Sequence, residues 1–317
     1  MKNKLFIEKN IEPMLIKEQH QPFSDPGYIF ELKMDGLRCI AYLDPEKGTD
    51  LRNKRNISLI RLYPELKDIH TYVKHKCILD GELVLFEKGV PNFHRMQKRS
   101  ILKDSFKIKI AATEAPVSFV AFDILELNEE TIMNLPLIER KNCLSLNVRN
   151  GERIYVSRYI EEQGELYYEA VLKRNLEGIV AKRKDSIYRP GKRSADWIKI
   201  KNTNDDDFII CGYFYQNNKE GLTFILGQYS KEGNLMYRGN VSLGVNNLLF
   251  MKNYNVSKSH DPIFPFLKIK GITWLMPTVV CTINYMYKDT GKLRQPVLKG
   301  FRDDKKAEEC ICRSDVN

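Results

Sequence analysis

The chain has 317 residues, of which 43% are hydrophobic and 29% are charged, and it carries a net charge of +10. This length predicts about two domains, and the composition excludes a disordered chain. The longest apolar stretches are too short and too interrupted by polar residues to cross a bilayer, and the N-terminal segment lacks the features of a secretory signal, so we expect a soluble intracellular protein.

In the first two thirds of the chain, alternating apolar patterns predict strands at residues 28–33, 37–43, 77–86, 117–127 and 177–182. Helical spacing predicts helices at 58–74, at 136–146 with a proline in the first turn, and at 161–175. This interleaving predicts an α+β domain built from antiparallel sheets. The short polar residues at 202–207 favour turns, and we interpret them as a linker.

Beyond the linker, the sequence predicts short strands at 208–215, 222–229, 234–243 and 279–287, and one helix near 246–254. A small barrel of about 100 residues is the expected closure, because a barrel removes exposed strand edges.

The positive charge is concentrated in two stretches. Residues 182–201 carry a net charge of +6 and residues 292–306 carry +4. Such runs are usually solvated faces, but aromatic residues and glycines are interleaved here, as in surfaces that bind phosphates.

The cysteines include no CxxC pair, which favours buried thiols in a reducing compartment. Cys310 and Cys312 could hold a metal, but without a second pair a frayed C-terminal tail is the favoured interpretation.

A lysine, Lys33, lies directly before a tight glycine turn between two predicted strands. A lysine in this place can act as a nucleophile if nearby cations or desolvation lower its pKa, because an amine must be neutral to attack. The alternative is a strand-end lysine in solvent.

Seven segments, in chain order, resemble the motifs of the nucleotidyltransferase superfamily of ATP-dependent DNA ligases and mRNA capping enzymes. The segments are Lys33-Met-Asp-Gly-Leu-Arg38, Leu51-Arg52-Asn53, Leu79-Asp-Gly-Glu-Leu-Val84, Phe119-Val-Ala-Phe-Asp123, Leu176-Glu-Gly-Ile-Val-Ala-Lys182, Trp197-Ile-Lys-Ile-Lys201 and the segment from Leu293 to Lys305. Leu51 and Lys54 depart from the family's SRNG-like pattern. The likeness covers residues 23–305 and is strongest to the ligase module of bacterial ligase D and stand-alone relatives.

The resemblance implies a nucleotidyltransferase domain, with ATP-grasp-like antiparallel sheets and helices, at residues 1–203. An all-β OB-fold barrel would follow at 204–305, and a C-terminal tail at 306–317. The implied activity is sealing of 5′-phosphate/3′-hydroxyl nicks through a lysyl-AMP intermediate and a DNA-adenylate, in DNA repair, recombination or replication. The implied cofactors are ATP and Mg²⁺ or Mn²⁺. Nicked double-stranded DNA is the expected partner, with a Ku-like end-binding protein as a second candidate, and we expect a monomer in the bacterial cytoplasm with no membrane association.

By the same resemblance, Lys33 attacks the α-phosphate of ATP and expels pyrophosphate. Lys199 and Lys201, two residues apart on one face of a strand, are expected to reach that phosphate and to lower the Lys33 pKa. Without the resemblance, two such lysines are more simply interpreted as solvated strand residues.

The resemblance assigns other residues to binding of the nucleotide. Glu31 is expected to hold adenine chiefly through its backbone, and Phe122 to stack on the base, although Phe122 alone could equally be a buried strand residue. Arg38 and Arg52 are expected to clamp phosphate or ribose, and Glu82 to bind ribose.

Three carboxylates, on Glu82, Glu177 and Asp304, are candidate ligands for Mg²⁺, which prefers one or two carboxylates together with phosphate oxygens and water. Glu177 is also assigned to nucleotide binding. Arg302 and Lys305 are expected to meet the β- and γ-phosphates of ATP in the first step, delivered by rotation of the barrel about the linker.

Three other functions stay open. A GTP-dependent mRNA capping guanylyltransferase shares the lysine and the barrel, but the ligase-like ending at residues 302–305 weighs against it. An RNA ligase would favour a different pattern after its lysine, and a non-catalytic nucleic-acid-binding scaffold would not need every charged motif residue. NAD as the adenylate donor is unexpected, since nothing resembles the nicotinamide-binding segment of that class. Only about 25 residues precede the first motif, so we expect the two basic stretches to grip the DNA.

Overall fold

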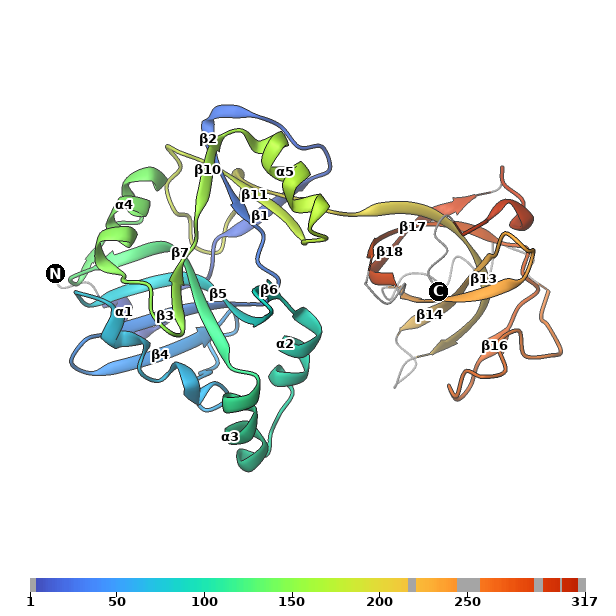
Figure 1. Ribbon diagram of the computed structural model, residues 1–317, viewed down its shortest axis with the longest axis horizontal. Helices are drawn as coiled ribbons and strands as arrows, with labels where there is room; N and C mark the ends of the chain where they lie inside the picture. The colour runs from blue at the N-terminus through green and yellow to red at the C-terminus, as the bar shows by residue number, and fades with distance from the viewer. Residues whose placement is uncertain (1–3, 216–220, 244–256, 288–292, 303, 313–317) are drawn as a thin grey trace. The chain divides into compact units, whose positions relative to one another are not determined.

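The structure is a computed structural model that describes residues 4–215, 221–243, 257–287, 293–302 and 304–312. The chain divides after Lys201 into two compact units, unit 1 (Met1–Lys201) and unit 2 (Asn202–Asn317), both drawn in Figure 1. In the part of the chain that the structure describes, no helix is long and apolar enough to cross a membrane.

Unit 1 contains two sheets. The larger sheet has the strand order β4-β3-β5-β7-β8, with β6 paired to β5 and β9 paired in parallel to β7. Its strands are β3 (Leu37–Asp44), β4 (Gly48–Asn53), β5 (Cys77–Glu87), β6 (Val90–Pro91), β7 (Val117–Leu127), β8 (Glu130–Thr131) and β9 (Ile154–Val156). The smaller sheet has the order β1-β12-β11-β2-β10, and only its β1–β12 pair is parallel. Its strands are β1 (Leu15–Gln19), β2 (Asp25–Leu32), β10 (Tyr159–Glu162), β11 (Gly178–Arg183) and β12 (Arg193–Lys201).

The core between the sheets follows from the alternation of side chains along each strand. Ile29 of β2 and Ile40 of β3 belong to one buried cluster, together with Trp197 of β12 and Phe122 of β7. The intervening residues pack into separate clusters on the outer faces of the two sheets. Residues two positions from Ile29 and Ile40 therefore also face the space between the sheets, and these are Glu31 and Arg38.

The helices cover the outer faces and edges of the sheets. They are α1 (Leu5–Glu8), α2 (Phe93–Ser100), α3 (Ser105–Glu114), α4 (Leu137–Asn147) and α5 (Gly164–Lys173), with 3₁₀ turns η1 (Pro64–Leu66) and η2 (Ile69–Tyr72). The predicted helix at 136–146 is confirmed as α4, which Pro136 caps. The predicted helix at 161–175 is confirmed as α5. This helix is shorter than predicted at its start, because residues 161 and 162 belong to β10.

The predicted helix at 58–74 is wrong. Pro64 lacks an N–H, and it disfavours helical geometry at Tyr63, whose φ of −127° is extended. Two 3₁₀ turns replace the helix and still bury the apolar residues whose spacing suggested it, namely Leu59, Tyr63, Leu66, Ile69 and Val73.

Unit 2 is a barrel whose strands follow the order β15-β14-β13-β17-β18, with β16 paired to β13. The strands are β13 (Asn204–Tyr215), β14 (Leu222–Tyr229), β15 (Leu235–Ser242), β16 (Thr273–Trp274), β17 (Val280–Tyr287) and β18 (Leu293–Arg302). The end strands β15 and β18 lie side by side and close the barrel around a buried apolar cluster. The four predicted strands are confirmed, and the helix predicted near 246–254 lies outside the described residues.

The predicted linker at 202–207 is too long, because only residues 202 and 203 lie between β12 and β13. The short polar residues suit a strand here, since side chains of the neighbouring strand form hydrogen bonds with their carboxylates. Asp205 accepts a hydrogen bond from Asn284 at 2.6 Å, and Asp206 accepts one from the Tyr285 hydroxyl at 2.5 Å.

The segment at 307–312 is packed rather than frayed. It begins with the 3₁₀ turn η3 (Ala307–Glu309), after which Tyr229 donates to the Cys310 carbonyl and Cys312 donates to the Tyr229 carbonyl, each at 2.8 Å. Ala307 and Cys310 are buried against the barrel. Cys310 therefore packs among apolar residues of the barrel. No group of three or more His, Cys, Asp or Glu that could hold a metal ion occurs among the described residues.

Candidate active site

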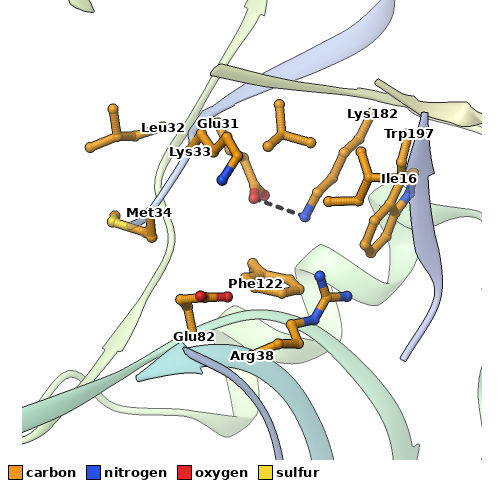
Figure 2. Close-up of a pocket in the computed structure, with 11 residues that line it drawn as sticks. Ile16, Glu31, Leu32, Lys33, Met34, Arg38, Glu82, Phe122, Lys182 and Trp197 are labelled. Carbon is orange, nitrogen blue, oxygen red and sulfur yellow. Dashed lines mark hydrogen bonds and ion pairs between the residues drawn. The ribbon is translucent and has the colours of Figure 1, made fainter. Parts of the chain in front are cut away.

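A pocket with about 380 Å³ of empty space lies between the two sheets of unit 1 (Figure 2). It is lined by Ile16, Glu31, Leu32, Lys33, Met34, Arg38, Glu82, Phe122, Val180, Lys182 and Trp197. Five of the residues assigned from the sequence therefore line one pocket. They come from β2, β3, β5 and β7 and from the connection after β2.

Lys33 follows the last residue of β2 and is tied to β11, because its N–H donates to the Gly178 carbonyl at 2.9 Å. Its Nζ lies 2.8 Å from Oε1 of Glu177, a carboxylate with a side chain only 4% exposed. Gly178 allows this approach, since its φ is +140° and a Cβ there would lie 2.1 Å from the Ile200 carbonyl oxygen. Pairing of β2 with β11 thus brings the motif lysine and the motif glutamate together.

The Glu31 carboxylate lies in a buried cluster with two lysines. Lys182 Nζ donates to it at 2.9 Å, and Lys141 of α4 forms a second ion pair with it. Burial opposes ionisation of Glu31, but the two ammonium groups prevail and lower its pKa. Burial lowers the pKa of Lys182 to about 8, against the opposing attraction of Glu31. The carboxylate of Glu31, and not only its backbone, is therefore part of the site.

The sequence assignment missed Lys141. It lies four residues after Leu137 and three before Leu144, and both leucines are buried on the inner face of α4. A lysine at a position that helical spacing places on a buried face is the signal that could have identified it, because a buried lysine needs a carboxylate partner.

Phe122 of β7 is 9% exposed, and two cations contact its ring. Lys182 Nζ lies 4.3 Å and Arg38 Cζ 4.5 Å from the ring centroid, and Figure 2 shows Phe122 flanked by these two side chains. Lys182 Nζ also lies 4.1 Å from the Trp197 ring. Cation–π contacts of this kind hold both cations beside an aromatic surface in the pocket.

Arg38 is fixed by Asp80, another residue that the sequence assignment missed. Its Nε and Nη2 each donate to the Asp80 carboxylate at 2.6 Å, which is the bidentate geometry of a strong ion pair. Asp80 also accepts from the Tyr188 hydroxyl at 2.7 Å, and that hydroxyl accepts from the Met14 N–H at 2.9 Å. This network connects β3, β5 and the segment before β1 beneath the pocket.

Glu82 of β5 adds a second carboxylate near Lys33. Burial raises the pKa of Glu82 to about 7, and Glu177 adds to the rise, while Arg38 and Lys33 oppose it. The carboxylates of Glu82 and Glu177 therefore repel each other close to Lys33.

Lys199 and Lys201 lie on the same face of β12 as Trp197, but they do not line the pocket. Both approach the Glu18 carboxylate of β1, with Nζ–Oε2 distances of 2.9 and 3.7 Å. Burial lowers the pKa of Lys201, and the charges of Lys199 and Lys33 add to this lowering. Lys33 and Lys201 are thus close enough to repel each other, and Glu18 is the partner that sequence reasoning missed.

Arg52 does not line the pocket. Its guanidinium donates to Asp50 at 2.9 Å and to the Asn56 carbonyl at 3.2 Å, and Lys9 shares the same Asp50 carboxylate. These contacts hold β4 to the loop that follows it.

The C-terminal motif residues form a separate cluster in unit 2. Arg302 donates twice to Asp304 at 2.7 Å and once to Asp207 at 3.3 Å, while Lys305 donates to Asp207 at 2.8 Å. Asp207 of β13 therefore neutralises two of the cations that the motif contributes, and the Asp304 carboxylate is held by Arg302.

Most cations of the basic stretch at 182–201 have carboxylate partners. Besides the lysines described above, Arg183 contacts Asp185 and Asp196, Lys184 contacts Glu161, and Arg189 contacts Asp196. The net charge of this stretch in the sequence thus overstates the positive charge that its surface presents.

In a comparison with known proteins, the chain matches two family models. They are the ATP dependent DNA ligase domain over residues 11–201 and the ATP dependent DNA ligase C terminal region over residues 218–305. The chain is 30% identical over 318 residues to the multifunctional non-homologous end joining protein LigD of Mycolicibacterium smegmatis, covering 96% of this chain and 40% of LigD. It is 27% identical over 294 residues to the SPbeta prophage-derived DNA ligase-like protein LigB of Bacillus subtilis, covering 92% of this chain and 99% of LigB.

A solved structure of mycobacterial DNA ligase D complexed with ATP and MES is also similar, with 27% identity, a TM-score of 0.57 and coverage of 95% of this chain and 98% of that one. The predicted fold, a nucleotidyltransferase domain followed by an OB-fold barrel, is confirmed. The chain belongs to the ATP-dependent DNA ligase family.

Proposed function

We propose that the protein is an ATP-dependent DNA ligase that seals 5′-phosphate/3′-hydroxyl nicks in duplex DNA through a Lys33–AMP intermediate. The observation that carries this proposal is the position of Lys33. Its Nζ lies 2.8 Å from Glu177, in a pocket that also contains the Phe122 ring and the ion pair of Glu31 with Lys182.

The reaction consists of three phosphoryl-group transfers. In the first, Lys33 Nζ bonds to the α-phosphorus of ATP as the bond from that phosphorus to pyrophosphate breaks. The amine must lose a proton before it attacks, and Glu177 is within hydrogen-bond distance to accept it. In the second, a 5′-phosphate oxygen of the nick takes the AMP and Lys33 leaves. In the third, the 3′-hydroxyl attacks the 5′-phosphorus and AMP departs.

The pocket offers contacts both to the ring face of adenine and to its hydrogen-bonding edge. The Phe122 ring offers an aromatic surface on which a base can stack. The Glu31 carboxylate can accept a hydrogen bond from the exocyclic amine of adenine, and the Lys182 ammonium can donate to a ring nitrogen. Guanine carries a carbonyl oxygen where adenine carries that amine, and the oxygen would face a carboxylate without a proton to share. This difference supports ATP over GTP as the substrate.

Glu82 and Glu177 fit a divalent cation such as Mg²⁺, because two carboxylates that repel each other beside a phosphate site are relieved by a hard cation. The bound ion would neutralise charge on the phosphates of ATP. Asp304 is proposed as a third ligand only if its bidentate contact with Arg302 opens.

The proposed biological partner is nicked duplex DNA. The name of the LigD relatives refers to end joining, and on that basis we place the activity in DNA repair, with a Ku-like end-binding protein as a candidate partner. The chain covers 40% of that relative's length, so the other activities of LigD are not assigned to it.

The experiment is intact-mass analysis after incubation with Mg²⁺ and either ATP or GTP, followed by a sealing assay on a nicked duplex. We expect addition of one AMP from ATP, no addition from GTP, and loss of the adduct in Lys33→Ala with the fold preserved. Lys54→Ala is the matched control, because Lys54 is an exposed lysine outside the pocket. An adduct that persists in Lys33→Ala would overturn the assignment, and GTP labelling would indicate a capping enzyme.

A further inference from the structure

A second basic surface lies on the helices between β6 and β7. Residues 95–109 carry a net charge of +5, which acidic residues elsewhere in the chain offset in the total. Two of the cations are neutralised, since Arg95 pairs with Glu87 and Arg99 with Glu65. Lys98, Lys103, Lys107 and Lys109 are exposed and form no ion pair with any residue that the structure describes.

Helix α3 of this surface buries none of its residues. Phe106 is 70% exposed and Ile110 is 40% exposed, and lysines lie next to both in the sequence. Asp104, the one acidic residue within 95–109, is occupied as the helix N-cap, since its carboxylate accepts from the Lys107 N–H at 2.8 Å. The exposed face of α3 therefore combines apolar and positively charged side chains that no described residue of unit 1 buries.

Hydrogen bonds and an ion pair attach this surface to the rest of unit 1. The Glu65 carboxylate accepts from Arg99 of α2 at 2.7 Å and from the Val117 N–H at 3.0 Å, where β7 begins. Arg99 also donates to the Leu62 carbonyl at 3.2 Å, and its side chain is 3% exposed. One buried ion pair thus fixes α2 to η1 and to the start of β7, so the connection that contains α3 is anchored at both of its ends.

The helices connect the two strands that supply Glu82 and Phe122 to the pocket, and Figure 1 shows them projecting from the end of the larger sheet. From Glu82 to the end of β5 at Glu87 the strand advances about 17 Å, at roughly 3.3 Å per residue. Along the duplex axis, successive phosphates of one DNA strand advance by about 3.4 Å. A duplex with its nick at the pocket and its axis along β5 would then pass α2 and α3 about five nucleotides from the nick.

We propose that Lys103, Lys107 and Lys109 form a docking surface for the phosphate backbone of the DNA substrate, about five nucleotides from the nick. Complementary charge identifies the occupant, because these lysines, two on α3 and Lys103 just before it, have no carboxylate partner among the described residues. Such lysines attract phosphates and release the counterions of the DNA. The basic stretch at 182–201 supports this choice by contrast, since most of its cations already have carboxylate partners. This inference rests on the proposed ligase function.

The test is the variant Lys103→Gln/Lys107→Gln/Lys109→Gln, which removes three charges and retains helix-forming side chains. Binding of a nicked duplex to the AMP-loaded protein is measured across a series of salt concentrations. We expect affinity at physiological salt to fall about tenfold, and the slope of log K against log salt to become shallower by about 2–3, at roughly 0.9 per lost contact. Self-adenylylation by ATP should stay unchanged, because none of the three lysines lines the pocket.

The matched control is Lys47→Gln/Lys74→Gln/Lys173→Gln, which removes the same charge from exposed positions elsewhere in unit 1. An unchanged salt slope in the α3 variant, or an equal loss in the control, would overturn the proposal while leaving the ligase assignment intact. If the unmutated protein fails to form the AMP adduct, the ligase assignment fails instead, and the two failures are distinguishable. Unchanged DNA binding in the α3 variant combined with loss of self-association or partner capture would show that a protein occupies this face.

Discussion

Replacing Lys141 by Met should destabilise unit 1, because it leaves the buried Glu31 carboxylate with one cation in place of two. The side chains of Lys141 and Glu31 are 2% and 3% exposed, so water cannot replace the lost ion pair. Removing one partner of a buried pair costs roughly 3–5 kcal/mol, and the remaining contact with Lys182 reduces this to about 2–3 kcal/mol. For a domain of this size we expect the Tm to fall by about 5–10 °C.

The assay is thermal unfolding by calorimetry, with Lys141→Arg as the variant that keeps the charge. In a Glu31→Gln background the same Lys141→Met change should cost nothing or stabilise the protein, since Lys141 then has no carboxylate to neutralise. A second readout is Lys182. The charge of Lys141 adds to the effect of burial in lowering the pKa of Lys182, so the variant should shift the alkaline loss of ATP binding to higher pH. A cost that is equal in both backgrounds, or below about 1 kcal/mol, would refute the reasoning.

Two further predictions concern the first chemical step. Burial raises the pKa of Glu82 to about 7, so its charge is present above that pH and lost below it. The Mg²⁺ concentration for half-maximal self-adenylylation should therefore rise as the pH falls through about 7. Glu82→Gln should remove this pH dependence. A Mg²⁺ requirement that does not change with pH in the unmutated protein would argue against Glu82 as a ligand. Lys305→Ala should slow AMP transfer from ATP to Lys33 by about tenfold or more and spare the sealing of a nick supplied already adenylylated, because that substrate lacks the β- and γ-phosphates. Equal losses in both assays would show that Lys305 serves folding, through its contact with Asp207, or DNA binding.

The central strands and the nucleophile could be predicted from the sequence because their signals are local. Alternation of apolar residues identified β2, β3, β5, β7 and β11, and the Lys33 motif lies on a connection between two of them. The error at residues 58–74 shows the limit of such signals. Helical spacing of buried residues does not distinguish one helix from two 3₁₀ turns, and there Pro64 decides between them.

The sequence by itself determined the fold class, the order of the motifs and the identity of five of the eleven pocket residues, since these depend on periodicity and on short segments. Only the tertiary structure decided which charges meet. Lys141 reaches Glu31, Asp80 fixes Arg38 and Glu18 holds Lys199, and each pair joins elements distant in sequence. The same pairing leaves the stretch at 182–201 largely neutralised and the lysines of α3 exposed. A sequence gives the number of charges in a segment, but the free energy of each charge depends on its burial and on the partner that folding brings within about 4 Å.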